Sequence, residues 1–189
     1  TFKNEKYYRF GIGNDYPDDF IKMDSVTKKI YNPLLDIKSS HFKEADHNAT
    51  PGLVITTALY EIFEDWSNVQ SKYISNNQKD LNIKSQLDQN ILSNYGVNLN
   101  FSLGILNVKG WYFYNEKEYD KAIEAWKILT DTYPNFSEDY LYIIKAQIEL
   151  KQNNTETVKQ FYNSLANSEF YTEKEKKDLV STKLELMMF

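Results

Sequence analysis

The stretch YYRFGIG at residues 7–13 runs aromatic residues into a glycine-bounded turn, a pattern typical of a buried β-strand. The polar residues NDYPDD at 14–19 supply the turn that ends this strand. From Phe20 to Leu35 apolar residues approximate helical spacing, which predicts an amphipathic helix. A second short strand is predicted from Asp36 to Glu44.

The loop DHNATP at residues 46–51 leads into a further helix. Thr50 is predicted to be its N-cap and Pro51 its first helical residue, since both are typical helix-start signals. The helix is expected to run from Pro51 to about Ser71. Its predicted apolar face consists of Val54, Ala58, Leu59, Ile62, Phe63 and Trp66. The order strand, helix, strand, helix predicts a parallel sheet with flanking helices.

The rest of the chain is predicted to be all-helical. One helix is expected from about Leu81 to Tyr95. Two helical stretches lie between Asn98 and Asn135, and a similar pair spans Ser137 to Asn167. Thr172 and Glu175 form a capping-box pattern, which predicts that a last helix begins there.

The first of these helix pairs resembles the tetratricopeptide repeat, a helix-turn-helix unit of about 34 residues. The positions that carry the resemblance are Gly110, Phe113, Tyr119, Ala122, Trp126, Leu129 and Pro134. The small residues Gly110 and Ala122 are expected to let two antiparallel helices approach closely. The second pair has Ile144 in place of the glycine and Thr157 in place of the alanine. It is therefore interpreted as a degenerate repeat.

Two roles are open for this helical module. It can be a packing appendage, because about three stacked repeats are normally needed to bury a continuous core. It can also bind a peptide or protein partner in a groove built on Trp111, Tyr114 and Lys145.

The segment from Asp46 to Phe63 resembles the closing segment of esterases similar to enterochelin and ferric-siderophore esterases. The matching residues are Asp46, His47, Asn48, Ala49, Thr50 and Pro51, followed by Leu59, Tyr60 and Phe63. The resemblance implies an α/β fold followed by an all-α part. The implied domains are the C-terminal portion of an α/β-hydrolase at 1–72, a linking helix at 73–97, and a tetratricopeptide-like module with a closing helix at 98–189.

The same resemblance implies that His47 is the catalytic histidine of a serine esterase. In α/β-hydrolases the triad follows the chain order Ser, acid, His, with the histidine in a loop after the last strand. An imidazole with an ordinary pKa of about 6.5 suits the general base. Asp15, just past the first predicted strand, is expected to orient it, with Asp18 and Asp24 as alternatives. His41 is interpreted as structural.

The nucleophile is missing from this scheme. No Gly-x-Ser-x-Gly elbow occurs, and Ser39, Ser40 and Ser67 lack its sharp glycine-flanked turn. The serine is therefore expected upstream of Thr1, and the chain alone is expected to be inactive. The parent enzyme would hydrolyse a small-molecule acyl ester without a cofactor or a metal. One alternative function is a non-catalytic tetratricopeptide-type interaction module. Another is a stand-alone α-helical adaptor, for which the match of Asp46 to Phe63 would be a coincidence.

The composition excludes several other classes of function. The formal net charge is -5 and the basic residues are scattered among acids, so nucleic acid is not an expected partner. No apolar run approaches the roughly 20 residues needed to span a bilayer. With no cysteine and only two histidines, disulfides, thiolate catalysis and a poly-histidine metal site are excluded. None of these features selects a cellular compartment.

Overall fold

The computed structural model describes residues 5–75 and 79–186 of the 189-residue chain. The contacts divide the chain into two compact units. The first, named the sheet unit, consists of Thr1–Val69 and Ser85–Leu99, and the second, named the helical unit, consists of Gln70–Lys84 and Asn100–Phe189.

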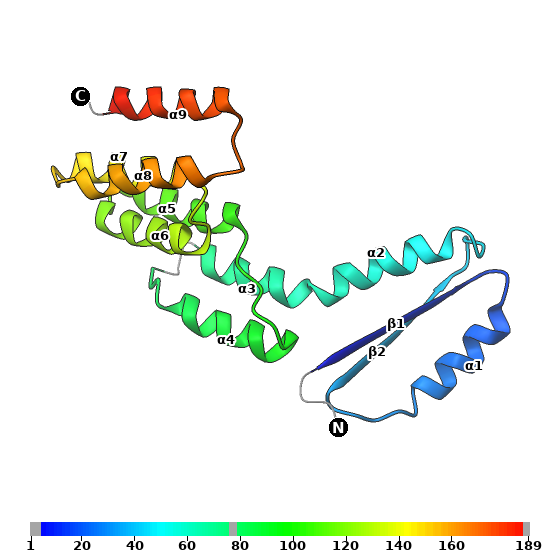
Figure 1. The fold of residues 1–189 in the computed structure, drawn as a ribbon. Coiled ribbons are helices and arrows are strands. Elements are labelled where there is room, and N and C mark those ends of the chain that lie inside the picture. Colours follow the sequence, from blue (N-terminus) through cyan, green and yellow to red (C-terminus); the bar gives the residue numbers. More distant parts are fainter. Residues whose placement is uncertain (1–4, 76–78, 187–189) are drawn as a thin grey trace. The chain divides into compact units, whose positions relative to one another are not determined.

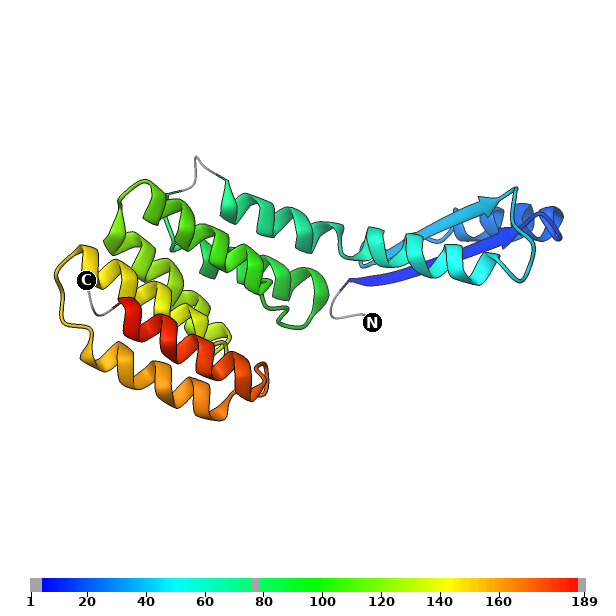
Figure 2. The same cartoon turned by 90° about the horizontal axis from the view of Figure 1, so that it is seen from above.

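The sheet unit is built on a strand-helix-strand crossover. Strands β1 (Lys6–Gly13) and β2 (Leu35–Phe42) pair in parallel along their whole length. Helix α1 (Pro17–Thr27) connects them, and helix α2 (Thr50–Ile62) follows β2. Figures 1 and 2 show α1 and α2 on opposite faces of the sheet, and each helix contacts both strands. The two predicted strands and their parallel pairing are therefore confirmed.

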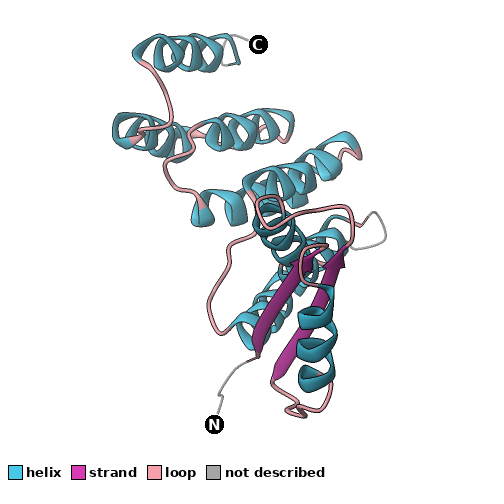
Figure 3. Cartoon of the chain, turned by 90° about the vertical axis from the view of Figure 1, so that its right-hand side faces the viewer, coloured by secondary structure: helices cyan, strands magenta, loops and turns pink. Residues whose placement is uncertain are grey.

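The predicted fold class is nevertheless wrong. The described residues form nine helices and one sheet of only two strands, as Figure 3 shows. This composition is consistent with a helical domain and not with the last strands of an α/β-hydrolase sheet followed by an all-α array. The alternation of strand and helix defines one local crossover. How many strands join a sheet depends on partners distant in sequence, which the alternation does not reveal.

Helix α1 is shorter than the helix predicted from Phe20 to Leu35. It ends at Thr27, whose hydroxyl donates to the carbonyl oxygens of Met23 and Asp24 at 3.1 Å each. Further along, Pro33 disfavours helical backbone at the residue before it. The chain therefore leaves the helix well before β2 begins.

The single helix predicted from Pro51 to Ser71 is also wrong, because α2 ends at Ile62 and a separate helix α3 (Glu64–Ile74) follows. The hydroxyl of Tyr95 occupies the break. It donates to the carbonyl of Ile62 at 2.7 Å and accepts the backbone N–H of Trp66 at 3.0 Å. A continuous helix would join those two backbone groups directly. A side chain from far along the chain thus replaces one helical hydrogen bond.

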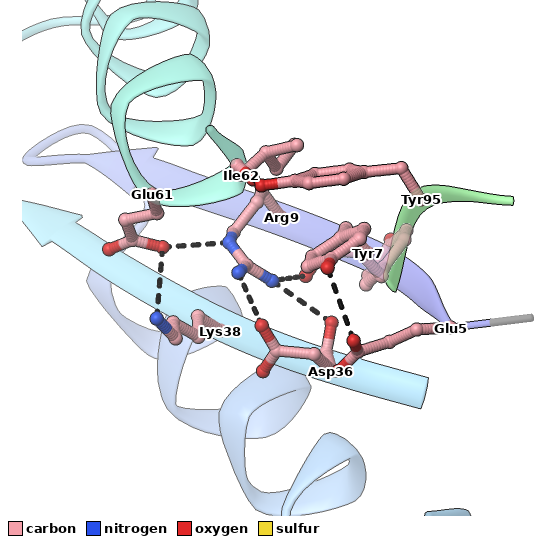
Figure 4. A network of polar contacts seen from close by, with 9 residues as sticks. Glu5, Tyr7, Arg9, Asp36, Lys38, Glu61, Ile62 and Tyr95 are labelled. Atoms are coloured by element: carbon pink, nitrogen blue, oxygen red, sulfur yellow. Dashed lines mark hydrogen bonds and ion pairs between the residues drawn. The ribbon is translucent and has the colours of Figure 1, made fainter. Parts of the chain in front are cut away.

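A buried arginine ties β1 to its two neighbours (Figure 4). The guanidinium of Arg9 forms ion pairs with Asp36 of β2 at 2.5 Å and with Glu61 of α2 at 2.7 Å. Lys38 lies 3.7 Å from the same Glu61 carboxylate. The Arg9 side chain is only 8% exposed, so its removal would leave two carboxylates without their main partner. The network therefore anchors the sheet unit.

The helical unit contains the C-terminal helices. The helix after α3 is α4 (Ile83–Tyr95), most of which belongs to the sheet unit. The helical unit then contains α5 (Leu103–Asn115), α6 (Tyr119–Thr132), α7 (Glu138–Glu149), α8 (Thr155–Asn167) and α9 (Glu173–Leu186). Helix α6 packs against α5 and α7, and α7 also packs against α8 and α9 (Figure 2). The backbone N–H of Thr172 donates to Glu175 at 2.7 Å, and that of Glu175 donates to the Thr172 hydroxyl at 3.3 Å. The predicted capping box is therefore confirmed.

The pair α5 and α6 closes around Gly110. A Cβ atom there would lie 2.1 Å from Nε1 of Trp126, so only glycine permits this approach. Trp126 and Ala122 are fully buried, and the Trp126 indole donates to Asn107 at 3.1 Å. The predicted close approach of the two helices is confirmed.

The turns α5–α6 and α7–α8 share one geometry. Lys117 and Lys151 adopt left-handed backbone, with φ of 61° and 56°. In both turns the next residue bonds back to a carbonyl five positions earlier, at 2.9 Å. This is the Schellman ending, in which glycine is the usual residue.

Candidate functional site

The candidate site lies where both strands end. Because β1 and β2 are parallel, their C-terminal ends meet at the same edge of the sheet. Asp15 follows β1 by two residues, and His47 follows β2 after a short turn. The fold thus brings together two predicted site residues that are 32 positions apart.

Asp15 holds His47 at two points. Its Oδ2 atom lies 2.6 Å from Nδ1 of the imidazole and accepts the backbone N–H of His47 at 3.0 Å. Because an ionised carboxylate only accepts hydrogen bonds, Nδ1 carries the proton in this pair. Nε2 of the neutral ring then holds the free lone pair, and it has no hydrogen-bond partner within the described residues. The His47 side chain is 68% exposed, so a reactant can approach it.

The two groups shift each other's pKa in opposite directions. The hydrogen bonds from the His47 side chain and backbone hold the pKa of Asp15 below its usual value. The hydrogen bond and the negative charge of Asp15 raise the pKa of His47 above its ordinary value. A histidine held in one tautomer by a carboxylate, with an open Nε2, is arranged as a general base.

The loop that carries His47 is held from both sides. The Asp46 carboxylate accepts the backbone N–H groups of Asn48 and Ala49 at 2.9 Å each, and the Thr50 hydroxyl donates to the Asp46 carbonyl at 2.6 Å. The prediction that Thr50 caps the helix is wrong, because Thr50 is already its first residue. The carboxylate of Asp46 reaches the free N–H groups ahead of the helix instead.

An open pocket of about 180 Å³ lies beside the pair. It is lined by Gly11, Ile12, Gly13, Asp15, Tyr16, His47, Thr50 and Pro51. No serine is among these residues. Within the part of the chain that the structure describes, no three histidine or carboxylate groups lie close enough to hold a metal ion. The pocket therefore offers an imidazole and a carboxylate, but no serine hydroxyl.

The two alternative acids, and the histidine that was interpreted as structural, lie elsewhere. Asp24 accepts the Ser39 hydroxyl at 2.5 Å, and Asp18 stands in the first turn of α1. His41 stacks on Phe20, with ring centroids 4.8 Å apart. None of the three contacts His47 in the described structure.

Gly13 and Tyr16 line the pocket but were not predicted as site residues. Tyr16 is adjacent to Asp15 in the sequence, and this adjacency could have identified it as a site residue. For Gly13 the signal was weaker, because a glycine at the end of a strand is also an ordinary turn residue.

The aromatic cluster of the helical unit is well packed. The Lys145 ammonium lies 5.3 Å from the ring centroid of Trp111 and 5.1 Å from that of Tyr114. Trp111 also packs edge-on against Trp126 at 5.2 Å and against Tyr142 at 5.0 Å. These contacts link α5, α6 and α7, which fits a packing role.

None of the helices in residues 5–75 and 79–186 combines the length and apolarity needed to cross a membrane.

A comparison with protein-family models finds no match to the chain, and neither does a comparison with curated proteins. Among solved structures, the chain is similar to the crystal structure of an uncharacterised protein from Capnocytophaga ochracea DSM 7271, with 12% sequence identity and a TM-score of 0.49. The similarity covers 99% of this chain and 54% of that chain, so the chain spans about half the length of that protein.

Proposed function

We propose that the chain supplies the histidine base of a carboxylic-ester hydrolase that acts through an acyl-serine intermediate. The observation that carries the proposal is the Asp15 oxygen that contacts both Nδ1 and the backbone N–H of His47. This contact selects the tautomer in which Nε2 can accept a proton. The resemblance of residues 46–63 to siderophore-type esterases supports the same role for His47.

The proposed reaction begins with a serine hydroxyl beside Nε2 of His47. Nε2 takes the hydroxyl proton as the serine oxygen attacks the ester carbonyl carbon, and Asp15 stabilises the imidazolium that forms. The carbonyl then re-forms, the ester C–O bond breaks, and the imidazolium gives its proton to the departing alkoxide. Water attacks the acyl-serine in the second half, with His47 again accepting and returning one proton.

The serine is proposed to come from outside residues 1–189, since the lining of the pocket beside His47 contains none. The substrate is proposed to be a small-molecule acyl ester, because Ile12, Tyr16 and Pro51 give the pocket an apolar wall. The isolated 189-residue chain is then expected neither to hydrolyse esters nor to react with a fluorophosphonate serine probe. Stoichiometric labelling of a serine within it would contradict this part of the proposal.

The main test is His47→Ala in the intact protein that contains these residues. Because His47 is exposed, the variant should fold, while kcat for a chromogenic acyl ester should fall by several orders of magnitude, as loss of a triad member does. His41→Ala is the matched control and should cost far less activity when folded. Equal kcat for the wild type and a folded His47→Ala protein would remove the proposal.

A non-catalytic interaction module is the second candidate, and its contact surface would be the part of Trp111 and Lys145 that the packing of α5, α6 and α7 leaves exposed. In this case a partner peptide would bind to the cluster, and the Asp15–His47 pair would have no reaction to serve. The sequence that precedes residue 1 in the intact protein would distinguish the esterase from the interaction module. An intact Gly-x-Ser-x-Gly elbow supports the esterase, and its loss supports the module.

A further inference from the structure

The last residue of β1, Gly13, lies directly against the loop that carries His47. A Cβ atom at this position would lie 2.3 Å from the carbonyl oxygen of Ala45 and 2.5 Å from the Thr50 hydroxyl oxygen. Real Cβ atoms essentially never come within 3.0 Å of another heavy atom. Because the nearer atom belongs to the backbone, rotating a side chain cannot remove the overlap. A larger residue would have to push the loop away from β1.

The residues after Gly13 bind the same loop. The backbone N–H of Asn14 donates to the Ala45 carbonyl at 2.8 Å, which is the same oxygen that a Cβ at Gly13 would overlap. Asp15 then accepts the backbone N–H of His47 at 3.0 Å. Three consecutive residues, Gly13 to Asp15, therefore lie against Ala45 and His47 of the loop. A shift of the loop at its first contact would also lengthen the last.

Burial supports a tight fit at this place. Gly13 is buried, and Ala45 and Thr50 are 5% and 7% exposed. In contrast, the His47 side chain at the far end of the contact is mostly exposed. The position of the imidazole is therefore set by the backbone behind it, and little by packing around the ring.

We propose that Gly13 is a positioning residue for His47, because the absence of a side chain there seats the Ala45–Thr50 loop against β1 and brings the imidazole to Asp15. The catalytic meaning of this assignment rests on the proposed esterase function. The positioning itself can be measured without any catalysis.

Two other glycines provide control variants that distinguish the positioning of the His47 loop from general effects of an added methyl group. A Cβ at Gly11, also in β1, would lie 2.6 and 2.7 Å from side-chain atoms of Val54 and Phe42 and 3.1 Å from the Ser40 carbonyl oxygen, and none of these three nearest atoms belongs to the loop. At Gly52, in α2, a Cβ would meet nothing within 4 Å. Gly11→Ala therefore tests strain in the sheet, and Gly52→Ala tests a harmless methyl group.

The experiment is an NMR titration of the His47 ring protons in the 189-residue chain, with folding checked by circular dichroism. The wild type should show a His47 pKa above 6.5, and Asp15→Asn should lower it. Gly13→Ala should lower it to the Asp15→Asn value, and the double variant should show no further decrease. Gly52→Ala should leave it unchanged.

A folded Gly13→Ala protein with the wild-type His47 pKa would overturn the proposal, and so would an equal decrease in Gly11→Ala. If Gly13→Ala does not fold, Thr50→Val carries the test, since it removes the hydroxyl bond to Asp46 that holds the loop. A lowered His47 pKa in that variant supports the seating of the loop, and a wild-type value refutes it. Both outcomes are independent of kcat in His47→Ala, so the failure of one proposal is distinguishable from that of the other.

Discussion

Asp139 is a buried carboxylate in the helical unit. It lies in the first turn of α7 with its side chain fully buried, and neither oxygen has a hydrogen-bond partner among the described residues. Burial, and to a lesser extent the charge of Glu138, raise the pKa of Asp139 from 3.8 to about 8. At neutral pH the folded chain therefore holds this group mainly as the neutral acid.

The raised pKa of Asp139 makes the stability depend on pH in a defined direction. Between 3.8 and about 8 the folded chain keeps a proton that the unfolded chain has lost. The free energy of unfolding should therefore fall as the pH rises through this window, by up to about 1.4 kcal/mol per pH unit. From pH 5 to pH 7 the loss approaches about 3 kcal/mol, which is large against the usual stability of a domain. Outside the window both states carry the same charge at Asp139, and this contribution to the slope vanishes.

The test replaces the carboxyl group with an amide of the same shape that does not ionise. The stability of Asp139→Asn relative to the wild type should rise by the same amount, about 3 kcal/mol, between pH 5 and pH 7. Urea denaturation at several pH values measures this difference in the free energy of unfolding. In a Trp66→Phe background the remaining tryptophans, Trp111 and Trp126, report on the helical unit.

Asp178→Asn on the exposed surface of α9 controls for the loss of one negative charge. A stability difference between Asp139→Asn and the wild type that stays constant from pH 5 to pH 8 would refute the reasoning. Asp139 would then be ionised and paired in the folded state.

Three further predictions concern the site and the helix turns. If neutral His47 is the base, kcat/KM should rise with pH through the raised pKa of His47. Asp15→Asn should reduce kcat and move this rise to lower pH, and a rise at the same pH would contradict the role of Asp15 as the partner of His47. Lys117→Gly should stabilise the helical unit by about 0.5–1 kcal/mol, because glycine adopts the left-handed backbone without strain, whereas Lys127→Gly within α6 should cost about 1 kcal/mol. Shifts of the two urea denaturation midpoints in the same direction would contradict this. Ala122→Leu should overpack the buried contact with α5 and cost roughly 1–3 kcal/mol; an unchanged denaturation midpoint would show that the contact is loose.

The local elements could be predicted from the sequence because their causes lie within a few residues. The aromatic run into Gly13 and the capping pair Thr172 and Glu175 act over one turn or one strand. The spacing of Gly110 and Trp126 describes two neighbouring helices, which meet across a short turn. The order of acid and histidine after two parallel strands also predicted which carboxylate would lie near His47, and the distance of 2.6 Å to Asp15 agrees. Their catalytic role stays a prediction.

Other features depended on contacts between distant segments, which no local pattern records. Among the described residues the sheet has two strands, because strand pairing is decided by whichever segments meet. The alternation of elements was compatible with a larger sheet. The break between α2 and α3 falls where the Tyr95 hydroxyl reaches the backbone from about 30 residues away, while the apolar spacing alone favours one continuous helix.

The site shows the same division between local chemistry and tertiary contact. That a histidine and an acid follow two strands could be predicted from the sequence, since residue type and strand ends are local properties. That Gly13 lies against Ala45 and that Asp139 is buried away from solvent became visible in the three-dimensional fold. Close approach and burial depend on how the backbone packs in three dimensions, and the same glycine or aspartate in an open turn would be an ordinary surface residue.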